Sequence, residues 1–255
     1  MQKYNIVLIG AGNVATQLGL ALIQAKHTIH QVYSKHASSA SELAKKLKCS
    51  FTNSFDELAP NADIYIISVK DDAITGVAGH LQLKNKIVVH TSGSIYMDTI
   101  KKCSKNYGVF YPLQTFSKTK KADLKNVPIC IEANNKNTFK TLTILAKSIS
   151  NNVNKISSEQ RATIHLAAVF ACNFTNHFYA IADDILKSNK LSFDILKPLI
   201  AETAAKIQNN PPCEMQTGPA IRGDKKTMNK HLKMLSDDNY KQLYKLVSDS
   251  IESEK

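Results

Sequence analysis

The sequence predicts an α/β fold, in which an N-terminal, doubly wound parallel sheet is followed by an all-α C-terminal domain. Three observations support this prediction. Strand-length apolar runs alternate with helical patterns up to about residue 156, as is typical of a parallel sheet with helices on both faces. A glycine-rich turn follows the first apolar run, and only helical patterns follow residue 157. We therefore expect domains at residues 1–156 and 157–255.

Composition limits the classes of protein to which the chain can belong. The 255 residues, 43% of them hydrophobic, are enough for one or two domains with real cores. No apolar run approaches the roughly 18–20 residues that span a bilayer, so we expect no membrane partner. The first strand follows Met1 almost directly, and the five cysteines are scattered without a C-x-x-C pair. We therefore expect no signal peptide, no zinc site and no disulfide framework, as in a cytoplasmic protein.

The formal net charge of +12 is high, and lysines cluster at residues 45–48, 118–125 and 225–233. Nucleic-acid binding is one interpretation of this charge. No recognised nucleic-acid-binding module accompanies it, and the clusters lie in separate regions, so we expect no nucleic-acid partner. The other interpretations are a lysine-rich surface and a site for a phosphorylated cofactor or an anionic substrate.

The first apolar run, residues 6–9, leads into the motif Gly-x-Gly-x-x-Ala at residues 10–15. A helical pattern follows, so the motif stands between a strand and a helix, as in the Rossmann dinucleotide site. The first glycine allows a tight turn, the second lets a pyrophosphate approach the backbone, and the helix N-terminus binds the phosphates. The alternative is a glycine turn that binds nothing. The expected cofactor-binding residues are Gly10, Gly12, Asn13 and Val14.

The second predicted strand, residues 30–34, ends where NAD-binding sites carry an Asp or Glu for the ribose 2′-hydroxyl. Ser34 and Lys35 occupy that place here, and no carboxylate is available. A hydroxyl and a cation suit a 2′-phosphate, so we predict NADP rather than NAD as the cofactor, bound through Ser34 and Lys35. The alternative is an ordinary polar loop that opens the next helix.

Two further strands are predicted to end near the cofactor, because ligands of open α/β sheets bind outside the carboxyl ends of the strands. Residues 63–69 form a buried strand that ends at Val69 and Lys70. Val69 is a candidate for cofactor binding, and Lys70 either faces the cofactor or is a solvated loop lysine. The strand at residues 86–94 ends with Ser92 and Gly93, which we expect to border the nicotinamide.

The polar groups around these strand ends have mainly structural interpretations. His90 is interpreted as a satisfied structural histidine rather than an acid–base group. Asp71 and Asp72 are expected to cap the next short helix, and Ser94 is expected to cap a helix over residues 95–103. Residues 108–116 are predicted to be a strand that runs into a proline-containing loop. Strands are also predicted at residues 127–132 and 152–156, with a helix at residues 138–149.

A helix-only pattern begins near residue 157. A capping motif starts a helix that we expect to reach about residue 188 and, because it is apolar on most sides, to be buried. The exceptions are three polar residues, His165, Asn173 and Asn176. With a rotation of about 100° per residue around the helix axis, their side chains fall within roughly 80° of one another. Such groups need partners inside the protein, across a dimer, or in a substrate. His165 and Asn173 are the catalytic candidates, and His177 is interpreted as structural.

The loop at residues 216–224 contains two glycines and a proline that fix its backbone. Arg222 is held in this loop, where a guanidinium can bind a carboxylate or phosphate in bidentate fashion. The alternative is a structural contact between Arg222 and Asp224, which we expect to cap a helix over residues 225–235. Helices are also predicted at residues 193–208 and 239–251.

Several motifs together resemble a known family. They are the glycine motif, Ser34-Lys35, Thr91-Ser92-Gly93, the segment Tyr-Pro-Leu-Gln-Thr-Phe at residues 111–116, and the stretches at residues 165–173 and 217–224. Over nearly its whole length the chain resembles the bacterial Rossmann-like NADP oxidoreductases with a helical C-terminal domain of unknown function. This group is similar to pyrroline-5-carboxylate reductase, the β-hydroxyacid dehydrogenases and the deazaflavin-dependent NADP reductases. The resemblance implies NADP, a homodimer formed through the C-terminal helices, and a small-molecule substrate bound between the two domains.

Two positions depart from the patterns of these relatives. Tyr111 stands where the family often has His before Pro-Leu-Gln. Val169 stands four residues before Asn173, where the β-hydroxyacid dehydrogenases have Lys. We therefore do not transfer their mechanism, and His165 becomes the candidate proton donor, with Asn173 positioning the substrate and Arg222 acting as an anion clamp.

We accordingly expect an NADP-dependent oxidoreductase that transfers a hydride to or from a carbonyl/alcohol or imine/amine pair, since the cofactor carries the hydride and the protein positions it. The alternative hypothesis is a non-catalytic NADP-binding sensor or interaction protein.

Overall fold

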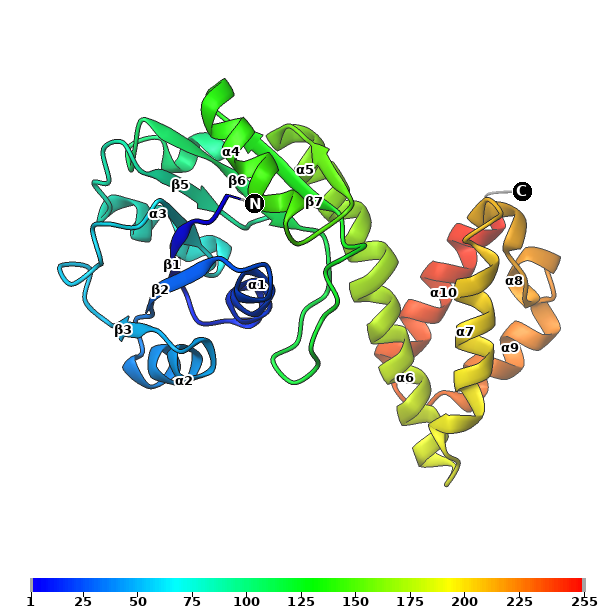
Figure 1. The fold of residues 1–255 in the computed structure, drawn as a ribbon. Helices are drawn as coiled ribbons and strands as arrows, with labels where there is room; N and C mark the ends of the chain where they lie inside the picture. Colours follow the sequence, from blue (N-terminus) through cyan, green and yellow to red (C-terminus); the bar gives the residue numbers. More distant parts are fainter. Residues whose placement is uncertain (1, 254–255) are drawn as a thin grey trace. The chain divides into compact units, whose positions relative to one another are not determined.

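The computed structural model describes residues 2–253, and the chain up to Lys155 contains one eight-stranded sheet (Figure 1). The strand order is β3-β2-β1-β4-β5-β6-β7-β8. Both β2 and β4 pair with β1 in parallel, so the chain winds outward from β1 in two directions, which is the doubly wound Rossmann arrangement. The strands are β1 Asn5–Ile9, β2 Thr28–Tyr33, β3 Ser50–Thr52, β4 Ile64–Ile67, β5 Ile87–His90, β6 Asn106–Pro112, β7 Ile129–Ala133 and β8 Val153–Lys155.

The sheet is mixed at one place. β6 and β7 are antiparallel, whereas the other neighbouring strands run parallel. Residues 113–128, which join β6 to β7, contain no helix, and parallel neighbours need a crossover connection that is usually a helix. The expected fold class is confirmed, and this connection explains why one strand pair departs from a wholly parallel sheet.

Helices cover both faces of the sheet. One core includes Leu18, Leu43 and Leu142, which belong to α1, α2 and α4. The core on the other face includes Ile74 of α3 and Ile100 of the 3₁₀ turn η1. Because strand side chains alternate between faces, each central strand contributes to both cores. The helical elements here are α1 Asn13–Gln24, α2 Ala37–Leu47, α3 Asp71–Gly79, η1 Met97–Ile100 and α4 Lys136–Lys147.

The chain after β8 is helical, as the sequence predicts. Ser157 caps α5 through a capping box with Gln160. The chain then passes through a π-helical segment, η2, into α6. The elements are α5 Ser158–Ala168, η2 Val169–Phe174, α6 Thr175–Ser188, η3 Phe193–Leu196, α7 Lys197–Lys206, η4 Pro212–Met215, α8 Pro219–Arg222, α9 Lys225–Met234 and α10 Asp238–Ser253.

The π-helical segment changes one expectation. Its residues bond at i→i+5 rather than i→i+4, so the spacing of about 100° per residue does not hold across it. The prediction that His165, Asn173 and Asn176 share one face rested on that spacing. Because η2 includes Asn173 and lies between His165 and Asn176, the regular spacing no longer supports that prediction.

The expectation of a buried central helix is also wrong for the single chain. Among the described residues, α6 has none that is buried, and α5 has only Ser158 and Arg161. Phe178 and Ile185 of α6 line a cavity with side chains of α10, yet both remain partly exposed. The helices of this small region therefore leave apolar side chains uncovered.

The chain divides into two compact units, one up to Phe170 and the other from Ala171. The change to helical structure near residue 157 thus precedes the division, and all of α5 and the start of η2 belong to the first unit. The expected helix at residues 95–103 is only the turn η1, with Tyr96 rather than Ser94 at its N-cap.

Within residues 2–253, no helix combines the length and the apolar character that a bilayer crossing would need.

Candidate active site

The first candidate residues form the turn between β1 and α1. Gly10 has a φ of +120°, and a Cβ there would lie 2.2 Å from the carbonyl oxygen of Ser68. Both the backbone angle and the available space therefore require glycine. The Gly10 N–H donates to the Tyr33 carbonyl at 2.7 Å, which ties the turn to β2. Val69 also lies against it, with Cγ1 3.3 Å from the position of that Cβ.

Gly12 has a different environment, because it lies at the N-cap of α1 beside open space. Apart from Gly12 itself and its chain neighbours, no described atom lies within 4 Å of the place that its Cβ would take, and no described side chain caps the helix. The first backbone N–H groups of α1 and the positive end of its dipole therefore face this space, which is the usual arrangement of an anion site. Gly12, Asn13 and Val14 are thus placed as a phosphate site requires, and phosphate binding stays a prediction.

Ser34 and Lys35 lie between β2 and α2. The Ser34 hydroxyl oxygen accepts from the His36 N–H at 3.4 Å, and Lys35 is exposed. No described side chain caps α2, and its first turn contains no acidic residue. A second uncapped helix N-terminus therefore lies beside a serine and a lysine, an arrangement that favours a dianionic group.

Lys70 is exposed and occupies the N-cap position of α3. The predicted capping residues Asp71 and Asp72 lie instead in the first turn of this helix, where their charges favour the positive end of the helix dipole. The Asp71 carboxylate accepts a hydrogen bond from the Ser94 hydroxyl at 2.5 Å. This bond connects the loops that follow β4 and β5.

His90 ends β5 and is completely buried. Its Nδ1 accepts from the Ser92 N–H at 3.2 Å. Burial, aided by the charge of Arg161, lowers the pKa of His90 to about 4, so the imidazole is neutral at physiological pH. The position is structural, as expected, but the ring is not fully satisfied, because Nε2 is buried with no hydrogen-bond partner among the described residues.

Ser92 and Gly93 form the turn after β5. The Ser92 hydroxyl oxygen accepts from the N–H groups of Ser94 at 3.1 Å and Ile95 at 3.0 Å, so this side chain shapes the turn. A Cβ on Gly93 would lie 2.6 Å from Nδ1 of His165. The imidazole of His165 therefore packs directly on the Gly93 backbone, and any larger residue at position 93 would displace it.

Tyr111 completes this cluster from β6. Its hydroxyl oxygen lies 3.2 Å from Nδ1 of His165, and the two rings meet edge to face with centroids 6.3 Å apart. Burial raises the pKa of Tyr111 to about 12, so the phenol keeps its proton. Because Tyr111 occupies Nδ1, the other ring nitrogen, Nε2, is the atom of His165 that remains for proton exchange.

A buried ion pair supports the turn after β5. Arg161 of α5 is 1% exposed, and its Nη1 donates to Oε2 of Glu132 at 2.7 Å. Its Nε donates to the Ser92 carbonyl at 3.1 Å, and its Nη2 donates to the Ile95 carbonyl. Glu132 in turn accepts from the backbone N–H of Ser158 at 3.0 Å. The network joins β7, the start of α5 and the turn that carries Gly93.

Neither this ion pair nor the contact between Tyr111 and His165 is predicted from the sequence. Glu132 and Arg161 are 29 residues apart, and nothing local relates a strand-end carboxylate to a helix cation. One feature of the sequence could have indicated Arg161: of 33 basic residues, only Arg161 and Arg222 are arginines. Arginine is preferred over lysine for buried ion pairs with several hydrogen bonds.

Asn173 and Arg222 belong to the second compact unit. Asn173 is exposed within η2, and Arg222 is the exposed last residue of α8. Asp224 caps α9 as predicted, accepting from the Thr227 N–H at 3.0 Å. Among residues 2–253 no carboxylate forms an ion pair with Arg222, so the alternative contact with Asp224 is not a salt bridge. The substrate roles of Asn173 and Arg222 stay predictions.

Known protein families match both parts of the chain. Residues 5–93 match the family described as NADP oxidoreductase coenzyme F420-dependent. Residues 127–251 match a domain of unknown function, DUF2520. No match to a curated protein is found. The first match covers the glycine turn and Gly93, and the second covers Glu132, Arg161 and His165.

Solved structures give a consistent result. The "putative NADP oxidoreductase" of Bacteroides fragilis is 46% identical, with a TM-score of 0.94 and 98% of each chain covered. A 1-pyrroline-5-carboxylate reductase of Streptococcus pyogenes is 14% identical, with a TM-score of 0.64 and coverage of 98% of this chain and 99% of that one. An imine reductase of Myxococcus stipitatus in complex with NADP+ is also 14% identical, with a TM-score of 0.61 and coverage of 98% and 92%. The last two share the fold.

These similarities define the class of protein. The chain belongs to the family of NADP oxidoreductases that join an F420-dependent NADP oxidoreductase domain to a C-terminal DUF2520 domain. This is an NADP(H)-binding family, and it is the family that the sequence motifs resemble.

Proposed function

We propose that this protein is an enzyme that transfers a hydride between NADP(H) and a small substrate, a carbonyl/alcohol or imine/amine pair. One observation carries the proposal, namely the cluster of Gly93, Tyr111 and His165. Gly93 follows β5, and Tyr111 is the next-to-last residue of β6. These two strands are parallel, so the cluster lies at the carboxyl edge of the sheet, where ligands of this fold bind.

His165 is the proposed acid–base group. NADPH, when bound, supplies the hydride that forms the new C–H bond of the reduced substrate. The substrate oxygen or nitrogen then needs one proton, which Nε2 of an imidazolium can give, leaving a neutral ring. Tyr111 holds Nδ1 at 3.2 Å, so it orients the ring without taking up a proton itself. Oxidation of the alcohol or amine uses the same atoms in reverse.

The proposed cofactor site uses two helix N-termini. The uncapped first turn of α1 at Gly12 suits the pyrophosphate, and the uncapped first turn of α2 beside Ser34 and Lys35 suits the 2′-phosphate. Val69 and Lys70 stand at the neighbouring strand end, close to the glycine turn. We propose NADP(H) rather than NAD(H) on these grounds, with Asn173 positioning the substrate and Arg222 binding an anionic group on it.

The test is turnover of oxo-acids, imines and deazaflavins, followed by NADPH absorbance. With any substrate found, we expect His165→Ala to lower kcat by at least about 100-fold while the Kd for NADPH stays within a factor of about two. Tyr111→Phe should lower kcat less and should shift the pH dependence of kcat, because the ring loses its partner at Nδ1. Full activity of His165→Ala would refute the proposed acid–base role.

A second candidate function is a non-catalytic NADP-binding sensor or interaction protein. Val169 stands where related dehydrogenases have a catalytic lysine, which favours this alternative. A sensor would bind NADPH and show no turnover in the same screen.

We also propose that the protein forms a homodimer through its C-terminal helices. Support comes from exposed apolar side chains, including Ile195 at 71% and Leu199 at 62% exposure. These two residues are four apart in the chain, in the adjoining elements η3 and α7. Contiguous exposed apolar side chains are typical of protein–protein interfaces.

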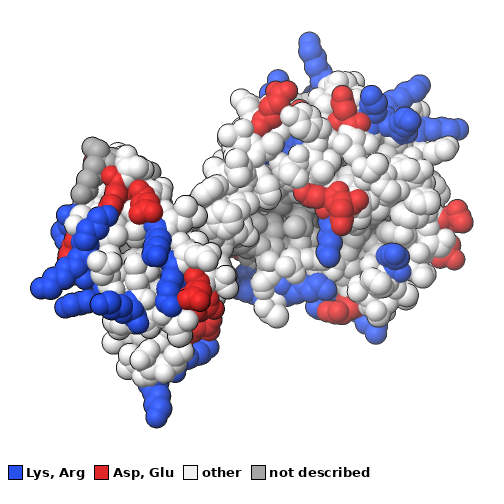
Figure 2. Space-filling model, turned by 180° about the vertical axis from the view of Figure 1, so that it is seen from behind, with Lys and Arg blue, Asp and Glu red and all other residues white. Residues whose placement is uncertain are grey.

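We propose no nucleic-acid partner. Figure 2 shows Lys and Arg side chains scattered over both units, with Asp and Glu among them, on the face in view. A nucleic-acid groove would concentrate positive charge in one stripe. Most of the lysines are therefore better interpreted as solvated surface side chains, apart from those near the proposed 2′-phosphate site.

A further inference from the structure

Four lysines line one hollow in the first compact unit. They are Lys84, Lys101, Lys102 and Lys105, and the hollow has a volume of about 620 Å³. Volumes of this size are typical of small-molecule sites. The four lysines come from two separate segments of the chain, and the fold brings them together beside one recess.

The directions of two strands place this hollow away from the candidate active site. β5 and β6 are parallel, so the residues just before them lie at the amino edge of the sheet. Lys84 and Lys105 precede these strands, whereas Gly93 and Tyr111 lie at the carboxyl edge. The seven residues of β6 put roughly 20 Å between the two edges. A ligand in the hollow is therefore distinct from a cofactor at the glycine turn.

Hydrogen bonds hold the two lysine-bearing segments together. The buried Ser104 hydroxyl is within hydrogen-bond distance of two carbonyl oxygens, those of Lys84 at 2.7 Å and Lys86 at 2.5 Å. The Lys105 N–H donates to the Lys84 carbonyl at 2.8 Å. Nδ2 of Asn134 donates to the Lys105 carbonyl at 2.9 Å. The backbone that carries the lysines is therefore fixed, although their side chains are exposed.

The positive charge of the hollow is not compensated within its lining. None of the described residues that line it is acidic, and within residues 2–253 none of the four lysines forms an ion pair. Asp98, whose carboxylate accepts from the Tyr107 hydroxyl at 3.2 Å, is not part of the lining. A cleft lined by charges of one sign focuses the electric field and concentrates counter-ions. The hollow should therefore attract anions.

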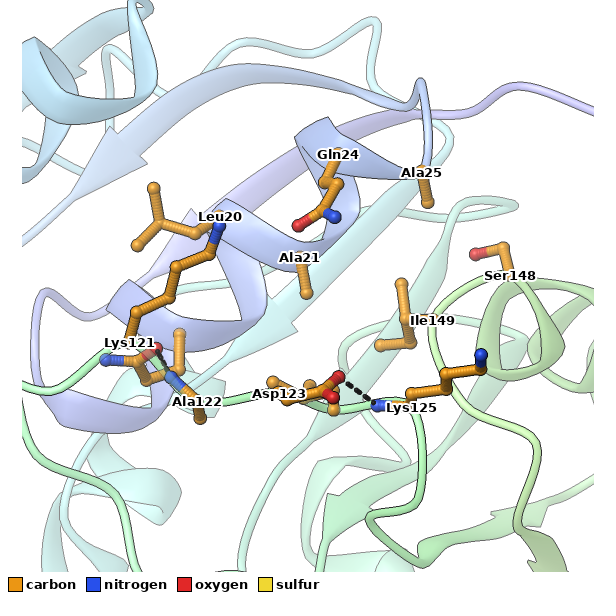
Figure 3. A pocket seen from close by; sticks show the side chains of 12 residues that line it. Leu20, Ala21, Gln24, Ala25, Lys121, Ala122, Asp123, Lys125, Ser148 and Ile149 are labelled. Atoms are coloured by element: carbon orange, nitrogen blue, oxygen red, sulfur yellow. Dashed lines mark hydrogen bonds between the residues drawn. The ribbon is translucent and has the colours of Figure 1, made fainter.

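A second cavity of the same unit has lysines without this uniform charge. It lies between α1 and residues 121–125 and is lined by Lys121 and Lys125 (Figure 3). Asp123 stands between the two lysines in Figure 3, and its carboxylate accepts from the Lys125 N–H at 3.0 Å. Leu20 and Ile149 add apolar surface to this cavity. Its two lysines therefore provide matched controls for those of the hollow.

We propose that the hollow is a second ligand site, which binds a compact ligand with several phosphate groups. Lysine binds phosphate as a point charge, and four lysines exceed the charge of about two that a single phosphate group carries. The lysines form one local group rather than a stripe, so a compact anion fits them better than a nucleic-acid strand. This inference does not depend on the proposed NADP(H) function, because the two sites lie at opposite edges of the sheet.

The experiment is a calorimetric titration of the full-length protein with inorganic tripolyphosphate. The salt concentration is about 0.1 M, at which exposed charges more than about 10 Å apart are largely screened. We expect the wild type to bind tripolyphosphate more tightly than orthophosphate. The double variant Lys84→Gln, Lys105→Gln should raise the Kd for tripolyphosphate about tenfold, as the loss of two exposed ion pairs does. Lys101→Gln, Lys102→Gln should give a similar loss.

The control is Lys121→Gln, Lys125→Gln, which removes the same charge from the second cavity and should leave the Kd for tripolyphosphate unchanged. Circular dichroism and urea denaturation check that each variant is folded. An equal loss in the control would overturn the inference, because net charge rather than position would then explain binding.

Three other results would also overturn the inference. The wild type could fail to bind tripolyphosphate, or bind it no more tightly than orthophosphate. Unchanged affinity in both variants of the hollow would place the bound anion elsewhere on the protein. A single-stranded oligonucleotide that binds through the same lysines more tightly than tripolyphosphate would indicate a nucleic-acid partner instead. None of these results decides the NADP(H) proposal, which cofactor titration tests separately.

Discussion

At the scale of single residues, the two glycines of the β1–α1 turn answer different physical requirements. Gly10 is required by the fold, because its φ is +120° and the Ser68 carbonyl occupies the place of a side chain. Gly12 has ordinary backbone angles and open space around it. The fold itself therefore does not require glycine at position 12, and we propose that the requirement comes from a ligand bound above the turn.

The first prediction compares alanine at these two positions. Gly10→Ala should lower the free energy of unfolding by roughly 2 kcal/mol or more, from strain and overlap. Gly12→Ala should change it by less than about 0.5 kcal/mol and yet weaken NADPH binding about tenfold or more, because a methyl group would separate the phosphate from the backbone. Urea denaturation and cofactor titration measure the two effects. Tight NADPH binding by Gly12→Ala would contradict the assignment of the phosphate site.

The second prediction concerns His90 and pH. Its pKa in the folded protein is about 4, below the ordinary value of 6.5, so between these values the unfolded chain binds more protons than the folded one. Stability from His90 is therefore complete above about pH 6.5 and is lost as the pH falls toward 4, with a slope of about 1.4 kcal/mol per pH unit. His27, whose pKa burial also lowers, adds to the loss.

His90→Asn tests this interpretation, since the amide oxygen can still accept from the Ser92 N–H. Urea midpoints measured from pH 7 to pH 4.5 should fall less steeply in this variant than in the wild type. His177→Gln, which changes an exposed histidine, should leave the slope unchanged. Equal slopes in His90→Asn and the wild type would contradict a buried neutral histidine at this position.

At the scale of helices and strands, the sequence predicts those features that depend on residues close together in the chain. The β1–turn–α1 unit, the start of α5 at Ser157 and the cap of α9 at Asp224 depend on residues a few positions apart. The antiparallel direction of β7, the π segment η2 and the ion pair of Arg161 depend on contacts between distant parts of the chain. No local pattern in the sequence indicates them, and for the same reason the contact between Tyr111 and His165 cannot be predicted from the sequence.

The Glu132–Arg161 pair makes the third prediction, because it joins β7, α5 and the turn after β5. Glu132→Gln leaves the Arg161 charge buried without its carboxylate, and should lower the free energy of unfolding by about 3 kcal/mol. Asp183→Asn, which breaks the exposed pair with Lys187, should cost less than about 1 kcal/mol. Similar costs for the two variants, measured by urea denaturation, would mean that the buried network does not hold the turn.

At the scale of the whole molecule, a cofactor-binding unit is combined with a helical unit that exposes apolar side chains. The first unit has cores on both faces of its sheet. In the second, α6 and α7 contain no buried residue among those described. This difference is why a dimer is proposed through the second unit and not through the first.

The fourth prediction is that sedimentation velocity shows a dimer of the full-length protein at micromolar concentration. Leu199→Glu should shift the protein toward the monomer, because it places a charge in the proposed apolar interface. Phe51→Gln, which changes an exposed apolar residue of β3 in the first unit, should leave the dimer intact. A wild-type monomer would refute the proposed assembly.

The central claim is that the two uncapped helix N-termini hold NADP(H) with its nicotinamide beside the cluster of Gly93, Tyr111 and His165. The most direct test is a crystal structure of the protein grown with saturating NADP+. We predict density for the pyrophosphate over Gly12, for the 2′-phosphate at Ser34 and Lys35, and for the nicotinamide ring beside Gly93 with C4 on the His165 side. Density for the dinucleotide anywhere else, or an empty turn at Gly12 in those crystals, would contradict the account.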